Sequence, residues 1–188
     1  METLADVRKL TVAEFHQLEF ADDDPHQYEL LAGELVKKKA PTPRHQRIVR
    51  DLAFAIHTLV QTQKSGTVLF APVDVFLDEY TAPQPDLVFV KADQLNLITN
   101  DGILGVPTLV AEVISPSSVY RDRVTKKQLY EQFGVAEYWL IDPDDEFIEI
   151  HTLQNGRYEL LSAASPLEGA LVSTVLPDLK LDLTASFA

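Results

Sequence analysis

The chain has 188 residues, with 16 Lys and Arg against 29 Asp and Glu, so its formal net charge is −13. Its length fits one domain over residues 1–188, and 46% apolar residues can build a core, which excludes a disordered chain. The absence of cysteine excludes disulfides, zinc–thiolate sites and a thiol nucleophile. No apolar run reaches the ~18 residues of a membrane span, and residues 1–10 lack the apolar stretch of a signal peptide. We therefore expect a cytoplasmic protein without membrane contact.

Apolar periodicity and turn residues predict alternating helices and strands, without a repeat or an interdomain linker. Thr11 and Glu14 form a capping box at the start of the first helix. Gly134 is a stop signal for the last helix, and Asn155-Gly156 is a strong hairpin turn. The expected elements in chain order are a helix at 11–20, a hairpin at 28–38, a helix at 45–63, strands at 67–77, 86–90 and 108–115, a helix at 121–133, and strands at 138–141, 147–153 and 157–162. They predict one mixed α/β domain whose central strands lie between helices.

The charged residues are unevenly distributed along the chain. Residues 19–34 hold six acids and no base, and residues 137–149 hold six more acids and no base. Residues 36–50 hold no acid but six bases, namely Lys37, Lys38, Lys39, Arg44, Arg47 and Arg50. An acidic protein binds nucleic acids weakly through diffuse charge, yet this basic segment has the charge to contact a phosphate backbone. The simpler alternatives are a solvated surface and, for the lysines, a charged strand edge that prevents aggregation.

Two acidic residues stand in strands that are otherwise apolar. Asp86 opens the segment 86–90, and Glu112 lies in the middle of 109–114. Because such strands are covered on both faces, these carboxylates must be paired, protonated or bound to a metal. If the strands are neighbours, Asp86 and Glu112 converge near a backbone carbonyl and form a site for Mg²⁺ or Mn²⁺, which prefer oxygen ligands. The simpler alternatives are a turn acid for Asp86 and a buried ion pair with Lys126 for Glu112.

The helix that follows the second of these strands carries a lysine. Asp122, Lys126 and Tyr130 lie four residues apart and therefore share one helix face. As a catalytic group, Lys126 would hold a scissile phosphate, orient the attacking water or stabilise charge in the transition state. The simpler alternative is an ion pair between Asp122 and Lys126, worth about 0.3–0.5 kcal/mol, with Tyr130 as a half-buried neighbour.

Several short segments follow one another in a characteristic order over residues 11–162. They are Tyr28-Glu29-Leu30, Gly33-Glu34-Leu35, Pro43 with His45, Pro85 to Val90, Glu112 to Ser118, Asp122 with Lys126 and Tyr130, Gly134-Val135, and Glu137 to Pro143. In this order the chain resembles the PD-(D/E)XK nuclease superfamily, and more closely its Uma family of putative restriction endonucleases, abundant in cyanobacteria. The resemblance implies a restriction-endonuclease-like core, in which helices flank a central mixed β-sheet.

The resemblance also implies roles for the buried acids and the lysine. Asp86 corresponds to the metal-binding aspartate of the superfamily, and Glu112 to its second acidic ligand. The usual lysine falls two residues after that acid, where this chain has Ile114. The resemblance therefore implies that the lysine has moved to the helix, as Lys126. Glu34 would be an outer acid of the Mg²⁺ or Mn²⁺ site.

The remaining expected site residues are supporting and nucleic-acid-binding residues. Asp122 and Tyr130 would support the catalytic groups. Contacts to nucleic acid are assigned to Lys37, Lys38, Lys39, Arg44, His45 and Arg47. Because restriction-like nucleases often act as dimers, the resemblance also implies a homodimer.

The leading functional hypothesis is a Mg²⁺- or Mn²⁺-dependent endonuclease that hydrolyses phosphodiester bonds of DNA. A catalytically inactive binding or assembly module with the nuclease fold is the alternative, favoured by Ile114 and by the strong acidity. A metal-dependent hydrolase of small phosphate esters is a third hypothesis, which a shallow neutral cleft would favour.

Overall fold

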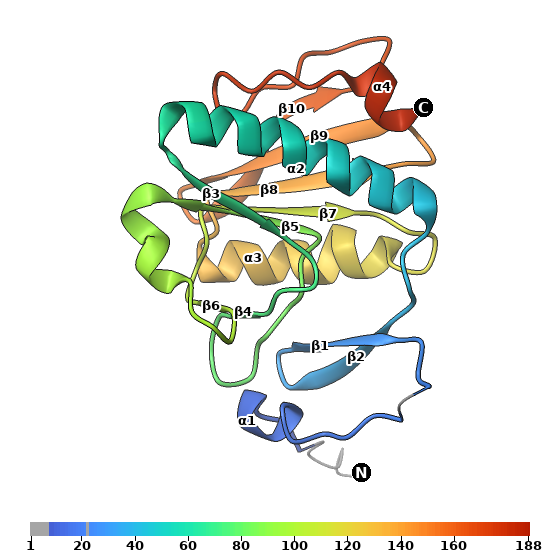
Figure 1. Cartoon of the computed structure of the whole chain (residues 1–188), viewed down its shortest axis with the longest axis vertical. Helices are drawn as coiled ribbons and strands as arrows, with labels where there is room; N and C mark the ends of the chain where they lie inside the picture. The colour runs from blue at the N-terminus through green and yellow to red at the C-terminus, as the bar shows by residue number, and fades with distance from the viewer. Residues whose placement is uncertain (1–7, 22) are drawn as a thin grey trace, which may run out of the picture.

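The computed structural model describes residues 8–21 and 23–188. Asp22 of the first acidic segment lies outside the described residues, as do residues 1–7, where no signal peptide was expected. The main sheet is built from β3 (Gly66–Phe70), β5 (Leu87–Lys91), β7 (Leu109–Val113), β8 (Glu137–Asp142), β9 (Phe147–Gln154) and β10 (Arg157–Ala164). Its strand order is β10-β9-β8-β7-β5-β3, with β7 and β8 parallel and the other neighbours antiparallel (Figure 1). The expected mixed α/β fold is therefore confirmed.

Helices cover both faces of this sheet. The helix α2 (Pro43–Gln63) packs its apolar side on one face, against alternate residues of the central strands such as Leu109, Ala111 and Val113. A second helix, made of the π-helical turn η2 (Arg121–Lys126) and α3 (Lys127–Phe133), covers the opposite face. Central strands covered on both sides explain the almost unbroken apolar runs of β5 and β7.

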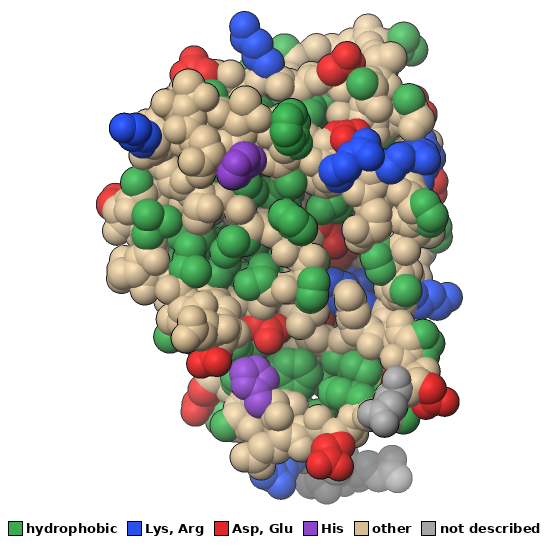
Figure 2. Space-filling view, in the orientation of Figure 1, with side chains coloured by type: hydrophobic (Ala, Val, Ile, Leu, Met, Phe, Trp, Pro, Cys, Tyr) green, Lys and Arg blue, Asp and Glu red, His purple; other side chains and the backbone are tan. Residues whose placement is uncertain are grey.

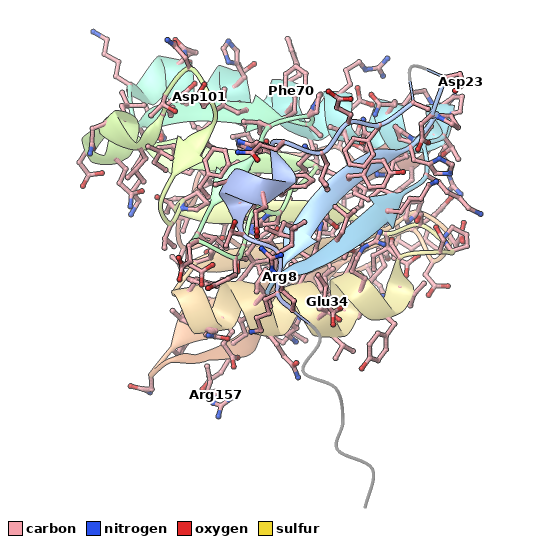
Figure 3. All side chains as sticks on the ribbon, turned by 90° about the horizontal axis from the view of Figure 1, so that it is seen from below. Arg8, Asp23, Glu34, Phe70, Asp101 and Arg157 are labelled. Atoms are coloured by element: carbon pink, nitrogen blue, oxygen red, sulfur yellow. The ribbon has the colours of Figure 1, made fainter. Side chains whose placement is uncertain are left out.

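The smaller elements lie at the borders of this layered core. They are α1 (Val12–Phe15), the hairpin strands β1 (Gln27–Leu31) and β2 (Glu34–Lys38), the short parallel pair β4 (Val75–Phe76) and β6 (Ile103–Leu104), the 3-10 helix η1 (Ala92–Leu97) and α4 (Leu183–Phe187). Figure 3, seen from below, shows the β1–β2 hairpin in front of the main sheet. Within the described part of the chain, no helix has the length and apolarity to cross a bilayer.

The local sequence signals account for most element boundaries. Thr11 and Glu14 form the expected capping box, although the helix that follows is only four residues long. The second helix begins at Pro43, two residues before the expected start, because the Thr42 side chain caps it and proline fits a first helical turn. Asn155 and Gly156 both have positive φ, as a tight hairpin turn requires.

The register of β5 against β7 places the two buried acids. The strands are antiparallel, with Leu87 opposite Ala111, so Asp86 before β5 lies at the end of β7 that holds Glu112. Side chains alternate along β7, and Val110 and Ile114 pack under α3 with Tyr130. Glu112 lies between them in the sequence and therefore faces the same helix.

Candidate active site

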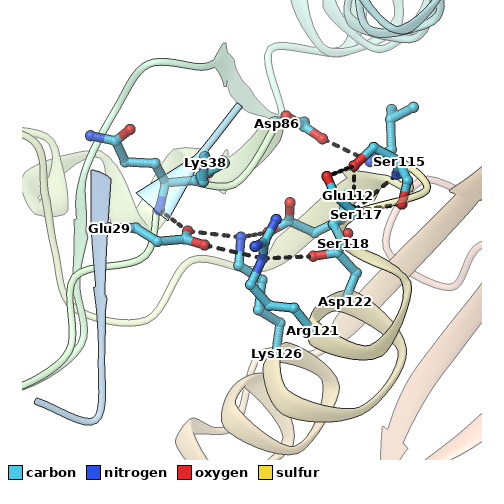
Figure 4. Close-up of polar contacts among 12 residues, drawn as sticks. Glu29, Lys38, Asp86, Glu112, Ser115, Ser117, Ser118, Arg121, Asp122 and Lys126 are labelled. Atoms are coloured by element: carbon cyan, nitrogen blue, oxygen red, sulfur yellow. Dashed lines mark hydrogen bonds and ion pairs between the residues drawn. The ribbon is translucent and has the colours of Figure 1, made fainter. Parts of the chain in front are cut away.

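A buried lysine joins two carboxylates that come from distant parts of the chain. Lys126 Nζ lies 2.7 Å from Oε1 of Glu112 and 2.9 Å from Oε2 of Glu29 on β1 (Figure 4). The Tyr130 hydroxyl donates a hydrogen bond to the same Glu112 oxygen at 3.1 Å. All four side chains are buried. The helical face predicted from the i, i+4 spacing thus reaches the acid in the middle of β7.

Asp86 lies at the other side of this cluster. Its Oδ2 accepts a hydrogen bond of 2.8 Å from the backbone N–H of Val113, which the pairing of β5 with β7 brings close. The same oxygen lies 3.1 Å from Nε2 of His45, in the first turn of α2. His45 therefore contacts an acid of the site, whereas the sequence assigned it only to the nucleic-acid surface.

The two acids line a cavity of about 650 Å³. One wall is the segment from β2 to the start of α2, including Lys37, Lys38, Lys39, Arg44 and His45, and the other is the loop 115–118 with the start of the following helix. Lys126 lies below this surface, since its side chain is only 1% exposed. A substrate in the cavity would contact the carboxylates directly, whereas Lys126 would act on it from behind Glu112.

Burial and charge set the protonation of Glu112 and Lys126. Burial, together with the nearby charges of Asp86 and Asp122, raises the pKa of Glu112 to about 8, although Lys126 acts in the opposite direction. Burial alone would lower the pKa of Lys126, but Glu112, Glu29 and Asp122 raise it above its usual value. Lys126 therefore stays an ammonium, while Glu112 holds a proton near neutral pH unless another cation approaches.

The neighbouring acids differ in their titration. Burial would raise the pKa of Asp86, but the hydrogen bond and charge of His45 outweigh it and lower that pKa. In return, Asp86 raises the pKa of His45 against the effect of burial. The pKa of Glu29 is lowered by Lys126 and Lys38 despite its burial. Asp86 and Glu29 are thus carboxylates, each held in the charged form by a neighbouring cation.

The donor set fits a magnesium-like ion held by two carboxylates. Among residues 8–21 and 23–188, no cluster of three or more His, Cys, Asp or Glu could hold a metal ion. Asp86 Oδ1 and Glu112 Oε2 take no hydrogen bond from the described residues, so both oxygens have a free lone pair. Mg²⁺ is commonly bound by one or two carboxylates, with water and substrate phosphate completing its shell. Its charge would also lower the raised pKa of Glu112.

The hairpin contributes a different acid from the one expected. Glu34 begins β2 beside the hairpin turn, is exposed and does not line the cavity (Figure 3). Glu29, in the middle of β1, reaches Lys126 instead. A weak sequence signal pointed to Glu29, because residues two apart in a strand share one face, and a face that buries Leu31 also buries Glu29.

The expected nucleic-acid-binding residues lie at the cavity, with one exception. Lys37, Lys38, Lys39, Arg44 and His45 line it, and Arg47 does not. Several of these bases already have partners: Lys37 lies 3.6 Å from Asp24, and Arg44 lies 3.1 Å from Glu146 and 3.8 Å from Asp144. On the face drawn in Figure 2, basic side chains likewise stand beside acidic ones instead of forming one continuous basic surface.

The mixed sheet flanked by helices on both faces places the protein in the restriction-endonuclease-like class, and its cluster holds one acid before β5, one in β7 and a lysine beside them. The chain belongs to the Uma2 family, described as "Putative restriction endonuclease", which matches residues 12–184. The resemblance seen in the sequence is therefore confirmed, and family and fold together support a nuclease.

A solved structure shares the fold over almost the whole chain. It is a putative nuclease belonging to DUF820 from Anabaena variabilis ATCC 29413, with a TM-score of 0.76 and 20% sequence identity. The match covers 95% of this chain and 99% of that one. At this identity the likeness establishes the fold alone. No curated protein matches the chain.

Proposed function

We propose that this chain is a Mg²⁺- or Mn²⁺-dependent endonuclease that hydrolyses phosphodiester bonds of DNA. The observation that carries the proposal is the meeting of Asp86 and Glu112 at one cavity, with the Lys126 ammonium bonded to Glu112 beneath it, in a fold shared with a putative nuclease. Divalent metals are general in restriction-endonuclease-like families, and the free oxygens of the two acids suit such an ion. The proposal includes a single domain over residues 1–188 and a cytoplasmic homodimer.

The residues of the site would divide the work as follows. Asp86 and Glu112 would hold the metal, which when bound polarises a phosphoryl oxygen and lowers the pKa of the attacking water. Lys126 keeps its charge at neutral pH and would stabilise the negative charge that develops on the phosphate. Glu29 and Tyr130 are positioning residues, because one fixes the ammonium and the other fixes the Glu112 carboxylate.

The bases at the cavity entrance would contact the DNA backbone. Lys39 and Arg44 lie on the wall that faces the acids, and Lys38 donates a hydrogen bond of 2.9 Å to the backbone oxygen of Gln84. Phosphate contacts from such residues give affinity without reading sequence. We therefore expect binding that weakens steeply as salt is raised.

The proposal is tested by incubating the protein with supercoiled plasmid, linear duplex and circular single-stranded DNA. Each substrate is offered with Mg²⁺, with Mn²⁺ and with EDTA. We expect a divalent ion to permit cleavage of a circular substrate, because an endonuclease needs no free end. Absence of cleavage in every combination, or cleavage that persists in EDTA, would refute the proposal.

A catalytically inactive binding module remains the second candidate, and the burial of the lysine favours it. The Lys126 ammonium is already paired with Glu112 and Glu29, and Ile114 stands where the superfamily has its usual lysine. Calorimetry with Mn²⁺ separates the two functions. The nuclease requires Mn²⁺ binding that is lost in Glu112→Gln, whereas retention of DNA without any Mn²⁺ binding supports the module.

A further inference from the structure

Arg121 lies at the cavity in an unusual environment. Its Nε is 3.5 Å from Oε1 of Glu29 and 3.7 Å from Oδ1 of Asp122, and Figure 4 shows its guanidinium between these two acids. This Nε is buried and donates no hydrogen bond within the described part of the chain. None of the other guanidinium nitrogens of Arg121 has a hydrogen-bond partner among the described residues either. The carboxylates thus attract its charge but leave its donors free.

The π-helical turn brings Arg121 to the site. In an α-helix, residues five apart are separated by about 500°, so their side chains differ by about 140° in direction. A π-helix forms its hydrogen bonds from residue i to residue i+5, so residues five apart stack on one side. Arg121 and Lys126 are the two ends of η2, and both contact Glu29.

The two cations differ in what they can offer to a ligand. The Lys126 ammonium forms ion pairs with Glu112 and Glu29, and its side chain is 1% exposed. The side chain of Arg121 is 21% exposed and lines the cavity. A guanidinium has five N–H donors in a planar fork that matches the oxygens of a phosphate. Of these two cations, Arg121 is therefore the one whose terminal Nη donors are available to an anion in the cavity.

Arg123, two residues further on, is a natural comparison. Its Nη1 donates to Glu149 at 3.0 Å and its Nη2 to Asp142 at 2.9 Å, so its fork is saturated by protein carboxylates. Arg123 does not line the cavity. Arg123 thus has a structural role in the same helical turn. Arg121 differs from it in having a guanidinium without hydrogen-bond partners among the described residues.

We propose that Arg121 binds the non-bridging oxygens of the phosphodiester substrate and holds it against Asp86 and Glu112. This role rests on the proposed nuclease function, which it extends by naming the group that recognises the phosphate. Glu29 and Asp122 hold the guanidinium in place, and the substrate completes its hydrogen bonds. Because the contact is bidentate, a lysine at this position does not replace it.

The direct test uses dimethyl phosphate, the simplest phosphodiester, and the side-chain Nε–H resonances of the arginines. We expect a saturable shift of the Arg121 resonance in the presence of Mg²⁺, with the Arg123 resonance unchanged. No shift at Arg121 with Mg²⁺ or with EDTA would overturn the proposal, and so would equal shifts at both arginines. Since this readout needs no cleavage, a shift at Arg121 without any nuclease activity would reject the proposed function and leave the phosphate site standing.

Variants extend the test to nucleic acid. Arg121→Lys keeps the charge between Glu29 and Asp122, so the fold is retained, and we expect a roughly tenfold to hundredfold loss of oligonucleotide affinity. Arg123→Lys is the matched control, with affinity within about twofold of the unaltered protein. Equal affinity of Arg121→Lys and the unaltered protein would contradict the assigned contact.

Discussion

Lys126 donates a 2.7 Å hydrogen bond to Glu112, and this contact connects the helix over the sheet to β7, all five residues of which are buried. A buried ion pair is expensive to break, because the remaining partner keeps its desolvation cost without its compensating charge. The ammonium also contacts Glu29, so one side chain bonds two buried acids, one from the hairpin and one from the sheet. The site and the stability of the fold are thereby coupled.

Removing the ammonium tests this coupling. We expect Lys126→Met to lower the free energy of unfolding by about 3 kcal/mol, since Glu29 and Glu112 lose their shared partner. In the double variant with Glu29→Gln, the loss should be smaller than the sum of the two single losses. Urea denaturation at neutral pH measures both values. A stability of Lys126→Met within about 0.5 kcal/mol of the unaltered protein would show that the pair contributes nothing.

The two acids of the hairpin should differ in their effect on catalysis. We expect Glu29→Gln to reduce divalent-dependent cleavage at least about tenfold, because Lys126 loses one of the carboxylates that fix its position. Glu34→Gln removes the same charge from an exposed position on the same hairpin and should leave cleavage unchanged. The initial rate of plasmid nicking compares the two variants. A larger loss of cleavage in Glu34→Gln than in Glu29→Gln would show that Glu34 is the hairpin acid that supports catalysis.

The raised pKa of Glu112 predicts how the metal-free protein responds to pH. The folded protein holds this proton up to about pH 8, whereas an unfolded chain releases it near 4.5. Between these values the folded state binds more protons than the unfolded state, so stability falls as pH rises. The stabilising contribution of the Glu112 proton is fully present only below the pKa of the unfolded chain. Relative to Glu112→Gln, which cannot titrate, the unaltered protein should lose at least about 1 kcal/mol between pH 5 and pH 8.5.

Thermal unfolding in EDTA provides the measurement for this pH effect. For a chain of this size, 1 kcal/mol corresponds to a shift of about 2–4 °C in Tm. The comparison with Glu112→Gln cancels the contributions of titrating groups that are not coupled to Glu112, so the difference reports Glu112 together with its coupled neighbours such as His45 and Asp86. A Tm difference between the two proteins that stays constant over this pH range would contradict the raised pKa.

The acidic turn between β8 and β9 should weaken the binding of nucleic acid. Asp144 and Glu146 hold Arg44 at the cavity entrance, and exposed ion pairs of this kind are worth about 0.2–1 kcal/mol. We expect Asp144→Asn with Glu146→Gln to raise oligonucleotide affinity about twofold to fivefold at low salt. Fluorescence anisotropy provides the value, and Glu159→Gln with Glu168→Gln is the control for net charge. An equal gain in the control would assign the effect to net charge alone.

The parts of the site that the sequence predicts are those set by local pattern. Asp86 and Glu112 stand out because each interrupts an apolar strand, and the pairing of β5 with β7 depends on neighbouring segments of the chain. The helical spacing of Lys126 placed it on the correct face, even though the first turn is π-helical. Such features follow from periodicity and burial, which a sequence displays directly.

The missed parts depend on contacts between distant segments. Glu29 reaches Lys126 only because β1 lies beside η2, whose Arg121 and Lys126 both contact Glu29, and no local pattern fixes that arrangement. Arg121 joins the site through a π-helical turn, whereas regular α-helical spacing points it elsewhere. The sequence predicted unpaired bases in the segment 36–50, because the acids that pair with Arg44 lie about a hundred residues away in the sequence. Tertiary packing decides each of these cases.

In the proposed nuclease, Asp86 and Glu112 together hold the divalent ion that cleavage requires. The most direct measurement compares Mn²⁺-dependent nicking of supercoiled plasmid by the unaltered protein, Asp86→Asn, Glu112→Gln and the control Glu131→Gln, whose acid lies on α3 outside the cavity. Circular dichroism confirms that each variant is folded. We expect Asp86→Asn and Glu112→Gln to lose nicking while Glu131→Gln retains it. Full nicking by folded Asp86→Asn or Glu112→Gln would show that the acid is not needed to hold the ion.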